Sequence, residues 1–311
     1  MTYHLANTRH FDTRNDCFVI DLDLNCVKNQ LAVNLCNKSI EIIDAKTLQT
    51  IQELKDLDSM NSLIKYSSRE KNQLMVCTAE AVHLYDVRDK CHKSLKQFIA
   101  NISQESGDRL FDISDIHLTC FDTNCDFTYL CAGTEVSEKD KNSYLLFWDI
   151  RRPALVLGAY YESHTNDVTD VAFHPQKRHL ICSGGCDELI NLFDLNETEE
   201  DEALISTLNV ESVVDRIHWT KSDENDLICL TREESIQLWN IDDILLKSNF
   251  NSLSLNSGFD YIVGTLGNEG VVCVGDSGHC IKMFDINTSV TSDRILILKF
   301  LAMDTTKWFG L

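Results

Sequence analysis

The sequence contains little proline and glycine, and no long run of apolar residues. Its 311 residues include two prolines and twelve glycines, so no flexible linker rich in these residues divides the chain. No stretch approaches the run of about 18 apolar residues that a membrane-spanning helix requires, and no apolar N-terminal segment resembles a secretory signal. These absences favour a single domain over residues 1–300, followed by an irregular tail at 301–311, and they argue against a membrane partner.

Positive charge is scarce as well. The chain carries 28 Lys and Arg residues against 49 Asp and Glu residues, which gives a net charge of −21. Such a surface repels nucleic acid and anionic membranes, and it favours proteins with basic segments as partners. The same charge also serves simply to keep a β-rich protein in solution. The densest acidic run, from Glu197 to Glu202, is expected to form a solvated loop between two strands.

Thirteen cysteines are present, but their pattern does not indicate disulfide bonds. Several lie within apolar runs, such as Cys77 in QLMVCTA and Cys229 in DLICL, where a free cysteine packs as a small hydrophobic residue. The count is odd and no secretory signal precedes them. We therefore expect reduced cysteines in an intracellular protein of the cytoplasm or the nucleus.

Neither a metal site nor a cofactor site is indicated. Cys120 and Cys125, and likewise Cys182 and Cys186, lack the CxxC spacing and the second ligand pair of a zinc site. The segment GTLGNEG at 264–270 scatters its glycines with no helix after them, which predicts a hairpin turn rather than a phosphate-binding loop. We expect no metal and no cofactor.

One strand motif occurs six times and decides the fold. In each copy a short apolar strand ends in an aromatic or aliphatic residue followed by Asp or Asn, at Asp44, Asp86, Asp149, Asp194, Asn240 and Asp285. Neighbouring copies are 42, 63, 45, 46 and 45 residues apart, and most of these spacings match a propeller repeat of roughly 40–45 residues. One such unit cannot bury its apolar faces alone. The copies therefore predict an all-β propeller of four-stranded sheets, with six blades visible.

Between these motifs, alternating and short apolar runs predict the remaining strands, and no helical pattern persists beyond one turn. In the fifth repeat the outer strand is weak and is placed near Asn251–Leu255. Two insertions explain the spacing of 63 residues: the polar stretch EVSEKDKN at 135–142, and further residues from Asn101 to Gly107. Such loops often carry binding specificity, and equally often they are exposed connections without a role.

The fourth repeat reads SHTNDVTDVAFHP and then LICSGGCDELINLFDL, and it resembles the WD-repeat family. A His before the first strand, then Ser-Gly-x-x-Asp and an aromatic-Asp pair are typical of that family. The resemblance implies a β-propeller and places His164, Ser183, Asp187 and Phe193 in the family's structural tetrad of hydrogen-bonded side chains. The fourth member is usually Trp, whose indole N–H donates to the hydroxyl. Phe193 cannot donate, so we expect a network of three members.

A Ser, a His and an Asp together also suggest a hydrolase. A nucleophilic Ser needs an exposed position, often at a strand-to-helix elbow, with oxyanion donors nearby. Ser183 instead ends an apolar strand that no helix follows. Mutual hydrogen bonding beneath a blade turn is therefore the favoured interpretation, and no residue is assigned as catalytic.

A second motif ends the third repeat, where Trp148, Asp149, Ile150 and Arg151 match the WDxR box and Arg152 follows. Within the WD-repeat family, some proteins with this box are substrate receptors that dock on the propeller adaptor of a cullin-RING ubiquitin ligase. The resemblance implies that Arg151 projects from the blade rim and contacts an acidic adaptor surface, with Asp149 and Arg152 beside it. The alternative is that Trp148 is core and that the rest is a common strand ending.

From about Leu31 to Asp285 the order of segments is similar to one particular member of the family, on the strength of LCAGTEV, YLLFWDI, LGAYYESHTNDVTDVAFHP and ETEEDEALIST. After Asp285 only 26 residues remain, fewer than a blade of about 40. Three interpretations stay open. Six blades close into a ring with a strand from residues 2–12; or the chain is a truncated propeller that lacks its final blade, which we favour; or an open ring has its strand edges covered by a partner.

The sequence therefore predicts a non-enzymatic scaffold, a monomer whose loops bind one or more proteins. The first alternative is a substrate receptor of a cullin-RING ligase that docks through Trp148–Arg151. The second is a hydrolase that uses Ser183, His164 and Asp187.

Overall fold

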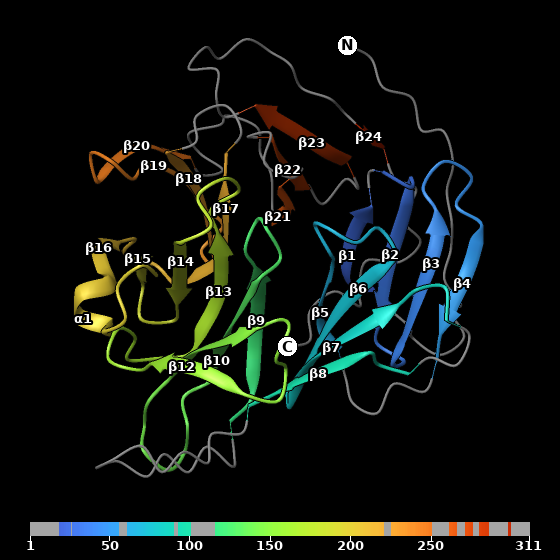
Figure 1. The fold of residues 1–311 in the computed structure, drawn as a ribbon. Coiled ribbons are helices and arrows are strands. Elements are labelled where there is room, and N and C mark those ends of the chain that lie inside the picture. Colours follow the sequence, from blue (N-terminus) through green and yellow to red (C-terminus); the bar gives the residue numbers. More distant parts are fainter. Residues whose placement is uncertain are drawn as a thin grey trace. The chain divides into compact units, whose positions relative to one another are not determined.

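The fold is seen in a computed structural model of the chain (Figure 1). The structure describes residues 19–25, 27–55, 61–89, 93–100, 116–220, 225–250, 261–265, 271–275, 280–285 and 298–299. The chain forms two compact units, Asn7–Asp215 and a second that comprises Arg216–Leu311 with Met1–Ala6. The single domain expected over residues 1–300 stays a prediction. The tail at 301–311 lies outside the described residues.

Four-stranded antiparallel sheets make up the first unit, and in each of them strands that follow one another in the chain are neighbours in the sheet. The strands are β1 (Val19–Asn25), β2 (Gln30–Leu35), β3 (Ser39–Asp44), β4 (Thr50–Leu54); β5 (Asn61–Tyr66), β6 (Gln73–Thr78), β7 (Ala81–Asp86), β8 (Lys96–Ile99); β9 (Leu118–Thr123), β10 (Tyr129–Thr134), β11 (Leu145–Asp149), β12 (Val156–Tyr160); and β13 (Val168–Phe173), β14 (Leu180–Gly185), β15 (Leu189–Asp194), β16 (Leu204–Asn209).

Two further sheets of the same order belong to the second unit, whose boundary falls within β17. Their strands are β17 (Val214–Trp219), β18 (Asp226–Thr231), β19 (Ile236–Asn240), β20 (Leu245–Phe250); and β21 (Tyr261–Thr265), β22 (Val271–Gly275), β23 (Cys280–Asp285), β24 (Leu298–Lys299). β21 pairs antiparallel with β22, as the expected hairpin requires. The prediction of an all-β chain with six repeated four-stranded sheets is confirmed. The residues on which the closure of a ring depends lie outside the described ones.

The predicted position of the outer strand of the fifth sheet, near Asn251–Leu255, is wrong. The strand lies earlier, at Leu245–Phe250. A tight turn over residues 241–244 follows β19 at once, and Ile244 closes it in the left-handed region with a φ of 53°. This turn brings Leu245 opposite Asn240 and Phe250 opposite Ile236. Most residues of the strand are exposed, and polar residues such as Lys247 and Asn249 separate its apolar ones, so its apolar signal is weak.

The acidic run also differs from the expected solvated loop. Glu199 is the N-cap of a single helical turn, α1 (Glu200–Ala203), in which Ala203 is buried. Acidic side chains in the first turn of a helix are favoured by its dipole. The Glu200 carboxylate is bound by the protein and not only by solvent, since it accepts the backbone N–H groups of Tyr161 at 2.7 Å and Glu162 at 2.9 Å.

The Asp or Asn that ends each repeated motif has a local structural reason. In five of the sheets, a side-chain oxygen of this residue accepts a backbone N–H two or three residues later, at 2.8–3.0 Å. Such an Asx turn reverses the chain toward the outer strand. The acceptors are Asp44, Asp86, Asp149, Asp194 and Asn240.

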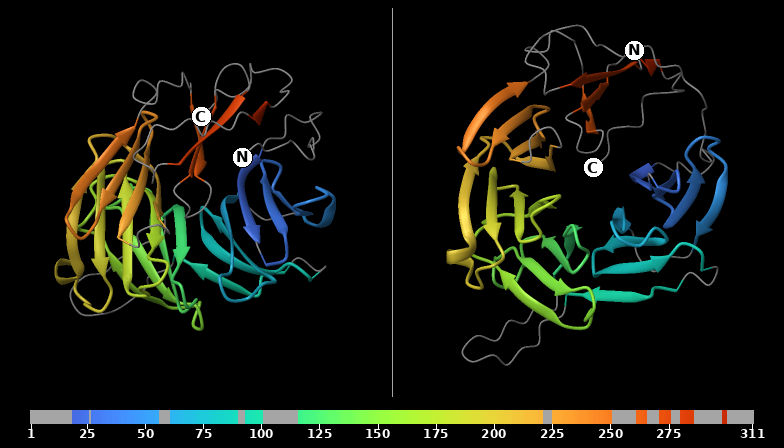
Figure 2. Two further views of the ribbon diagram at one scale, coloured as in Figure 1. Left: turned by 90° about the horizontal axis from the view of Figure 1, so that it is seen from above. Right: turned by 45° about the horizontal axis from the view of Figure 1, so that its top comes forward.

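Within the first unit, neighbouring sheets meet through their first strands: β1 contacts β5, β5 contacts β9, and β9 contacts β13 (Figure 2). Carboxylates link these strands. Asp23 accepts the Tyr66 N–H at 2.5 Å, Asp122 accepts the Phe173 N–H at 2.8 Å, and Lys65 contacts Asp122 at 2.5 Å. The first two bonds satisfy backbone donors of the next sheet and the third is an ion pair between β5 and β9, so polar groups fix the order of the sheets at this edge.

The space between neighbouring sheets is filled by apolar clusters. One cluster joins the second and third sheets around Trp148, whose ring is fully buried and meets Phe98 edge-on. Another joins the third and fourth sheets and contains Cys120 and Cys131. Burial raises the pKa of the Cys120 thiol, which therefore stays uncharged. The eight cysteines whose side chains the structure describes are thiols that form no disulfide bond.

Candidate functional site

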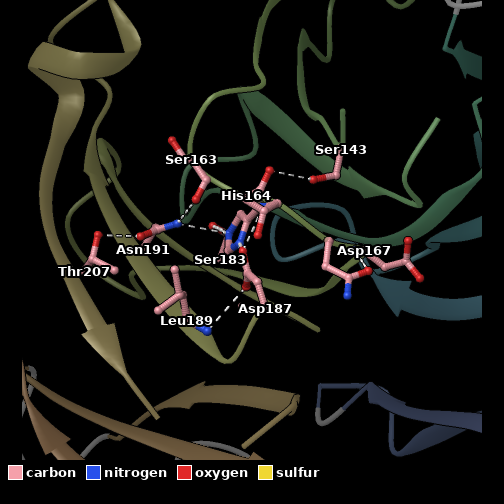
Figure 3. A network of polar contacts seen from close by, with 12 residues as sticks. Ser143, Ser163, His164, Asp167, Ser183, Asp187, Leu189, Asn191 and Thr207 are labelled. Atoms are coloured by element: carbon pink, nitrogen blue, oxygen red, sulfur yellow. Dashed lines mark hydrogen bonds and ion pairs between the residues drawn. The ribbon is translucent and has the colours of Figure 1, made fainter. Parts of the chain in front are cut away.

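The fourth sheet carries a buried chain of polar side chains (Figure 3). His164 lies just before β13, Ser183 lies in β14, and Asp187 lies in the turn between β14 and β15. The Nε2 atom of His164 is 2.7 Å from the Ser183 Oγ atom, and its Nδ1 atom is 3.0 Å and 3.2 Å from the two Asp187 oxygens. The structure thus brings together three of the four residues that the sequence singled out.

The chemistry of the partners fixes the direction of these bonds. A carboxylate only accepts, so Nδ1 of His164 donates to Asp187, and in the neutral imidazole Nε2 is left to accept the Ser183 hydroxyl. Asp187 also accepts the backbone N–H groups of Thr165 at 3.0 Å and Leu189 at 3.3 Å. Burial alone would raise the pKa of Asp187, but the hydrogen bonds from His164 and these N–H groups outweigh it, and the pKa lies below its usual value.

Asn191 extends this network, and the sequence interpretation missed it. It stands directly opposite Ser183 in the pairing of β14 with β15, and its Nδ2 atom lies 3.4 Å from Nε2 of His164. Its amide is held on both sides, because Nδ2 donates to the Ser163 carbonyl at 2.7 Å and Oδ1 accepts the Thr207 hydroxyl at 2.6 Å. A polar residue in the middle of the apolar strand LINLFD, opposite a Ser, was the available signal.

Phe193 does not join the polar chain. Its side chain is fully buried in the apolar cluster between the third and fourth sheets, with its ring centroid 5.2 Å from that of Tyr160. The register sets it opposite Ile181 rather than opposite Ser183. The lack of a fourth donor at Phe193 is thus accompanied by a polar partner two residues earlier, at Asn191.

The order Ser183, His164, Asp187 is that of a hydrolytic triad, and its distances would allow proton transfer. The burial of these side chains does not favour such a reaction. Ser183 has no exposed surface, and the side chains of His164 and Asp187 are 2% and 5% exposed. A nucleophilic hydroxyl must reach a substrate carbonyl, and this one is enclosed between strands. The geometry satisfies buried polar groups.

The inserted loop between β10 and β11 rests on this network. The Val136 N–H donates to Asp167 at 2.7 Å, and the Ser143 hydroxyl donates to the carbonyl of His164 at 3.3 Å. Within the loop, the Lys141 N–H donates to the Ser137 carbonyl at 3.0 Å, and the Tyr144 hydroxyl contacts Asp140. The insertion therefore has a fixed backbone, although Glu138, Lys139 and Lys141 are exposed.

Glu200 holds the segment on the other side of His164. Besides the two N–H groups it accepts, its carboxylate contacts the Ser163 hydroxyl. Glu200, which belongs to the acidic run, thereby holds residues 161–163, the segment just before His164, in place. No pattern in the sequence indicated this contact, since it joins residues 37 positions apart.

The opposite end of the third sheet carries the WDxR box. Trp148 is core, as the plain alternative stated. The Arg151 guanidinium donates two hydrogen bonds to the Asp149 carboxylate, from Nε at 2.9 Å and from Nη2 at 2.7 Å. These bonds lower the pKa of Asp149 to about 2. The Arg151 side chain is nonetheless 75% exposed, and Arg152 beside it is exposed too.

The second sheet has the same arrangement. Arg88 donates to Asp86 from Nε at 2.9 Å and from Nη2 at 2.5 Å, and its side chain is largely exposed. A bidentate Asp-x-Arg turn is therefore a recurring strand ending in this chain. Its presence at Arg151 is not specific to a docking surface.

Metal and membrane sites find no support in the described part of the chain. No three His, Cys, Asp or Glu side chains gather there as potential ligands of a metal ion. Among the same residues, no helix has the length and apolar character needed to cross a membrane.

Comparisons with known proteins agree with the repeat. No family model matches the chain. An uncharacterized WD repeat-containing protein of Saccharomyces cerevisiae is 26% identical over 215 residues, which cover 68% of this chain and 50% of that protein. One of Schizosaccharomyces pombe is 23% identical, with 63% and 55% covered. The WD repeat-containing protein 89 homolog of Dictyostelium discoideum is 25% identical, with 72% and 55% covered.

The matches therefore extend over about half the length of these relatives. The last of them carries the name of the family member to which the order of segments is similar. Shared sequence over most of this chain, together with its four-stranded sheets, supports a role in protein interaction in general terms. The chain is a relative of the WD repeat-containing proteins, and its fold is of the WD-repeat β-propeller class.

Proposed function

We propose that the protein is a non-enzymatic scaffold that binds other proteins through the loops around His164. One observation carries this proposal: the inserted loop at 135–142 presents exposed side chains from a backbone that buried hydrogen bonds hold to the fourth sheet. Rigid presentation lowers the entropy lost on binding. An exposed loop without a role would need no such attachment.

A basic partner suits the end of the sheets that carries the loops around His164. Four exposed carboxylates lie in three connections at this end, and the two loop lysines only partly offset them; the carboxylates are Glu135, Glu138, Glu162 and Glu188. The whole chain adds a net charge of −21. Partners with Lys- and Arg-rich segments would therefore associate faster and bind with a steep dependence on salt.

The test is affinity purification from cells with the full chain. The double variant Glu138→Lys/Glu162→Lys reverses two charges at the loops, and the matched control Glu53→Lys reverses one on the outer strand β4. We expect the double variant to lose partners that the wild type and the control retain, and those partners to dissociate as salt rises. Retention of every partner by the double variant would refute the proposal.

The absence of catalysis is part of the proposal. It is supported by the burial of Ser183 and by relatives from a family of generally non-enzymatic proteins. An active-site phosphonate probe labels a nucleophilic serine covalently. Labelling of the wild type that is lost in Ser183→Ala would establish the hydrolase instead.

A second candidate is a substrate receptor of a cullin-RING ligase that docks through the box at Trp148–Arg151. Support comes from the exposure of Arg151, whose Nη1 group is left available for an acidic surface while Asp149 fixes the side chain. Co-purification of the propeller adaptor tests it. Arg151→Ala should abolish co-purification and the matched control Arg88→Ala should not; adaptor binding unchanged in Arg151→Ala would exclude this role.

We further propose a monomer of the cell interior, in the cytoplasm or the nucleus, with no nucleic acid or membrane as partner. The eight described cysteines form no disulfide bond, which supports a reducing compartment. The negative charge opposes binding to phosphate backbones. Fractionation of cells with an antibody to the protein tests the location, and analytical ultracentrifugation tests the monomer.

A further inference from the structure

The outer strand of the third sheet, β12, has no charged residue, a feature that it shares only with β16 among the outer strands whose side chains the structure describes. β12 is hydrogen-bonded only to β11, so alternate residues direct their N–H and C=O groups away from the sheet. Natural sheets usually protect such edges with charged side chains. Among outer strands whose side chains the structure describes, β4 contains Glu53, β8 contains Lys96 and β20 contains Lys247, whereas β12 reads VLGAY and has no charge.

The surface of β12 is apolar and open. Leu155, just before the strand, is 46% exposed, and Leu157 is 49% exposed. Gly158 follows, and a Cβ atom placed there would meet nothing within 4 Å. A glycine in a strand with open space beside it allows another backbone to approach closely. The register shift near Leu157 does not set this strand apart, because the outer strands β4, β16 and β20 show one at the same place.

Two cationic residues, Arg151 and Arg152, lie just before β12. Arg151 is engaged by Asp149, but the Arg152 side chain is exposed and makes no hydrogen bond or ion pair in the described part of the chain. β16, the other uncharged outer strand, is instead preceded by the acidic turn α1. In a protein of net charge −21, a free cation beside an uncharged edge is the exception.

From these observations we infer that the β12 edge binds an extended peptide segment of a partner protein, with acidic residues at the end that lies beside Arg152. The backbone of the peptide adds a strand to the sheet, its acidic residues pair with Arg152, and its apolar residues cover Leu155 and Leu157. Five strand residues at about 3.3 Å each accommodate a segment of about five or six residues. The inference rests on the proposal that the chain binds proteins, and it adds a second surface, which starts at the end of β12 away from the His164 loops.

The test uses the full chain and fluorescent synthetic peptides of about eight residues, in which two aspartates precede or follow alternating valine and threonine. Fluorescence anisotropy should show binding of one of the two orders, weaker at about 300 mM than at about 50 mM salt. Arg152→Glu and Leu157→Lys should each weaken it by about tenfold or more. The matched controls Arg69→Glu and Ile205→Lys, the latter at a 52% exposed position of β16, should leave it unchanged.

Three outcomes would overturn the inference. They are no binding by either peptide, equal binding by a peptide with lysines in place of the aspartates, and equal loss in Ile205→Lys. Dimerisation of the chain that Leu157→Lys abolishes would assign the edge to a second copy instead. Because Glu138 and Glu162 lie away from Arg152 and Leu157, on which this test depends, failure here leaves the proposed function standing, and its failure leaves this result standing.

Discussion

In both the His164 network and the Asp149–Arg151 turn, a cationic or basic side chain holds a carboxylate. The two sites differ in how far their side chains are exposed to solvent. The side chains of His164 and Asp187 are almost fully buried, whereas the Arg151 side chain is 75% exposed. Buried polar groups cost free energy when a partner is removed, since water cannot replace it. Exposed pairs contribute little, because water and salt screen them. The first arrangement therefore stabilises the fold, and the second is available to a partner.

The largest expected effect separates these two sites. His164→Ala leaves both Ser183 and the Asp187 carboxylate without their shared partner, and we expect a loss of about 3 kcal/mol in the free energy of unfolding. Arg151→Ala should leave the thermal midpoint unchanged. Thermal denaturation followed by circular dichroism measures both, and a similar drop in the two variants would remove the distinction.

A smaller effect is expected from a pair of glycines in the third sheet. A Cβ at Gly133 would lie 2.5 Å from Val168 Cγ1 and 2.7 Å from Cys120 Sγ, whereas one at Gly158 would meet nothing. Gly133→Ala should therefore cost about 1–3 kcal/mol through overpacking. Gly158→Ala, as its control, should be close to neutral, and equal midpoints for the two variants would contradict the packing described.

The pH dependence of stability sharpens the comparison further. The pKa of Asp187 is below 3.8 in the folded state, so its carboxylate stabilises the fold above pH 3.8, and this contribution is lost as the pH falls through the lower folded value. Asp187→Asn should flatten the acid limb of a stability profile. A profile parallel to that of the wild type below pH 4 would show that Asp187 carries no such contribution.

The smallest effect concerns Asp149 itself. Its pKa of about 2 depends first on the side-chain hydrogen bonds from Arg151. In Arg151→Ala the pKa of Asp149 should rise toward 3.8, while stability stays the same because the pair is exposed. Titration followed by carbon NMR of the carboxyl group measures the shift, and a value that stays near 2 would mean that backbone donors alone set it.

Two of the features that the sequence interpretation missed depend on details that no sequence pattern shows. The position of β20 depended on a tight turn closed by Ile244, a β-branched residue in the left-handed region, and no propensity predicts such a turn. Glu200 was assigned to solvent because its partners lie far away in sequence. Asn191 could have been found, since its register opposite Ser183 follows from the two strands and the turn between them.

The sequence by itself determined the repeated sheets, their order along the chain and three members of the polar network, His164, Ser183 and Asp187, because period-two patterning, Asx turns and repeat spacing are local properties. Only the tertiary structure decided which polar groups are buried and which are exposed. It enclosed Ser183 between strands, tied the inserted loop to His164, and left the β12 edge uncovered beside Arg152. Burial results from contacts between residues distant in sequence, and for that reason spacing along the chain could not reveal it.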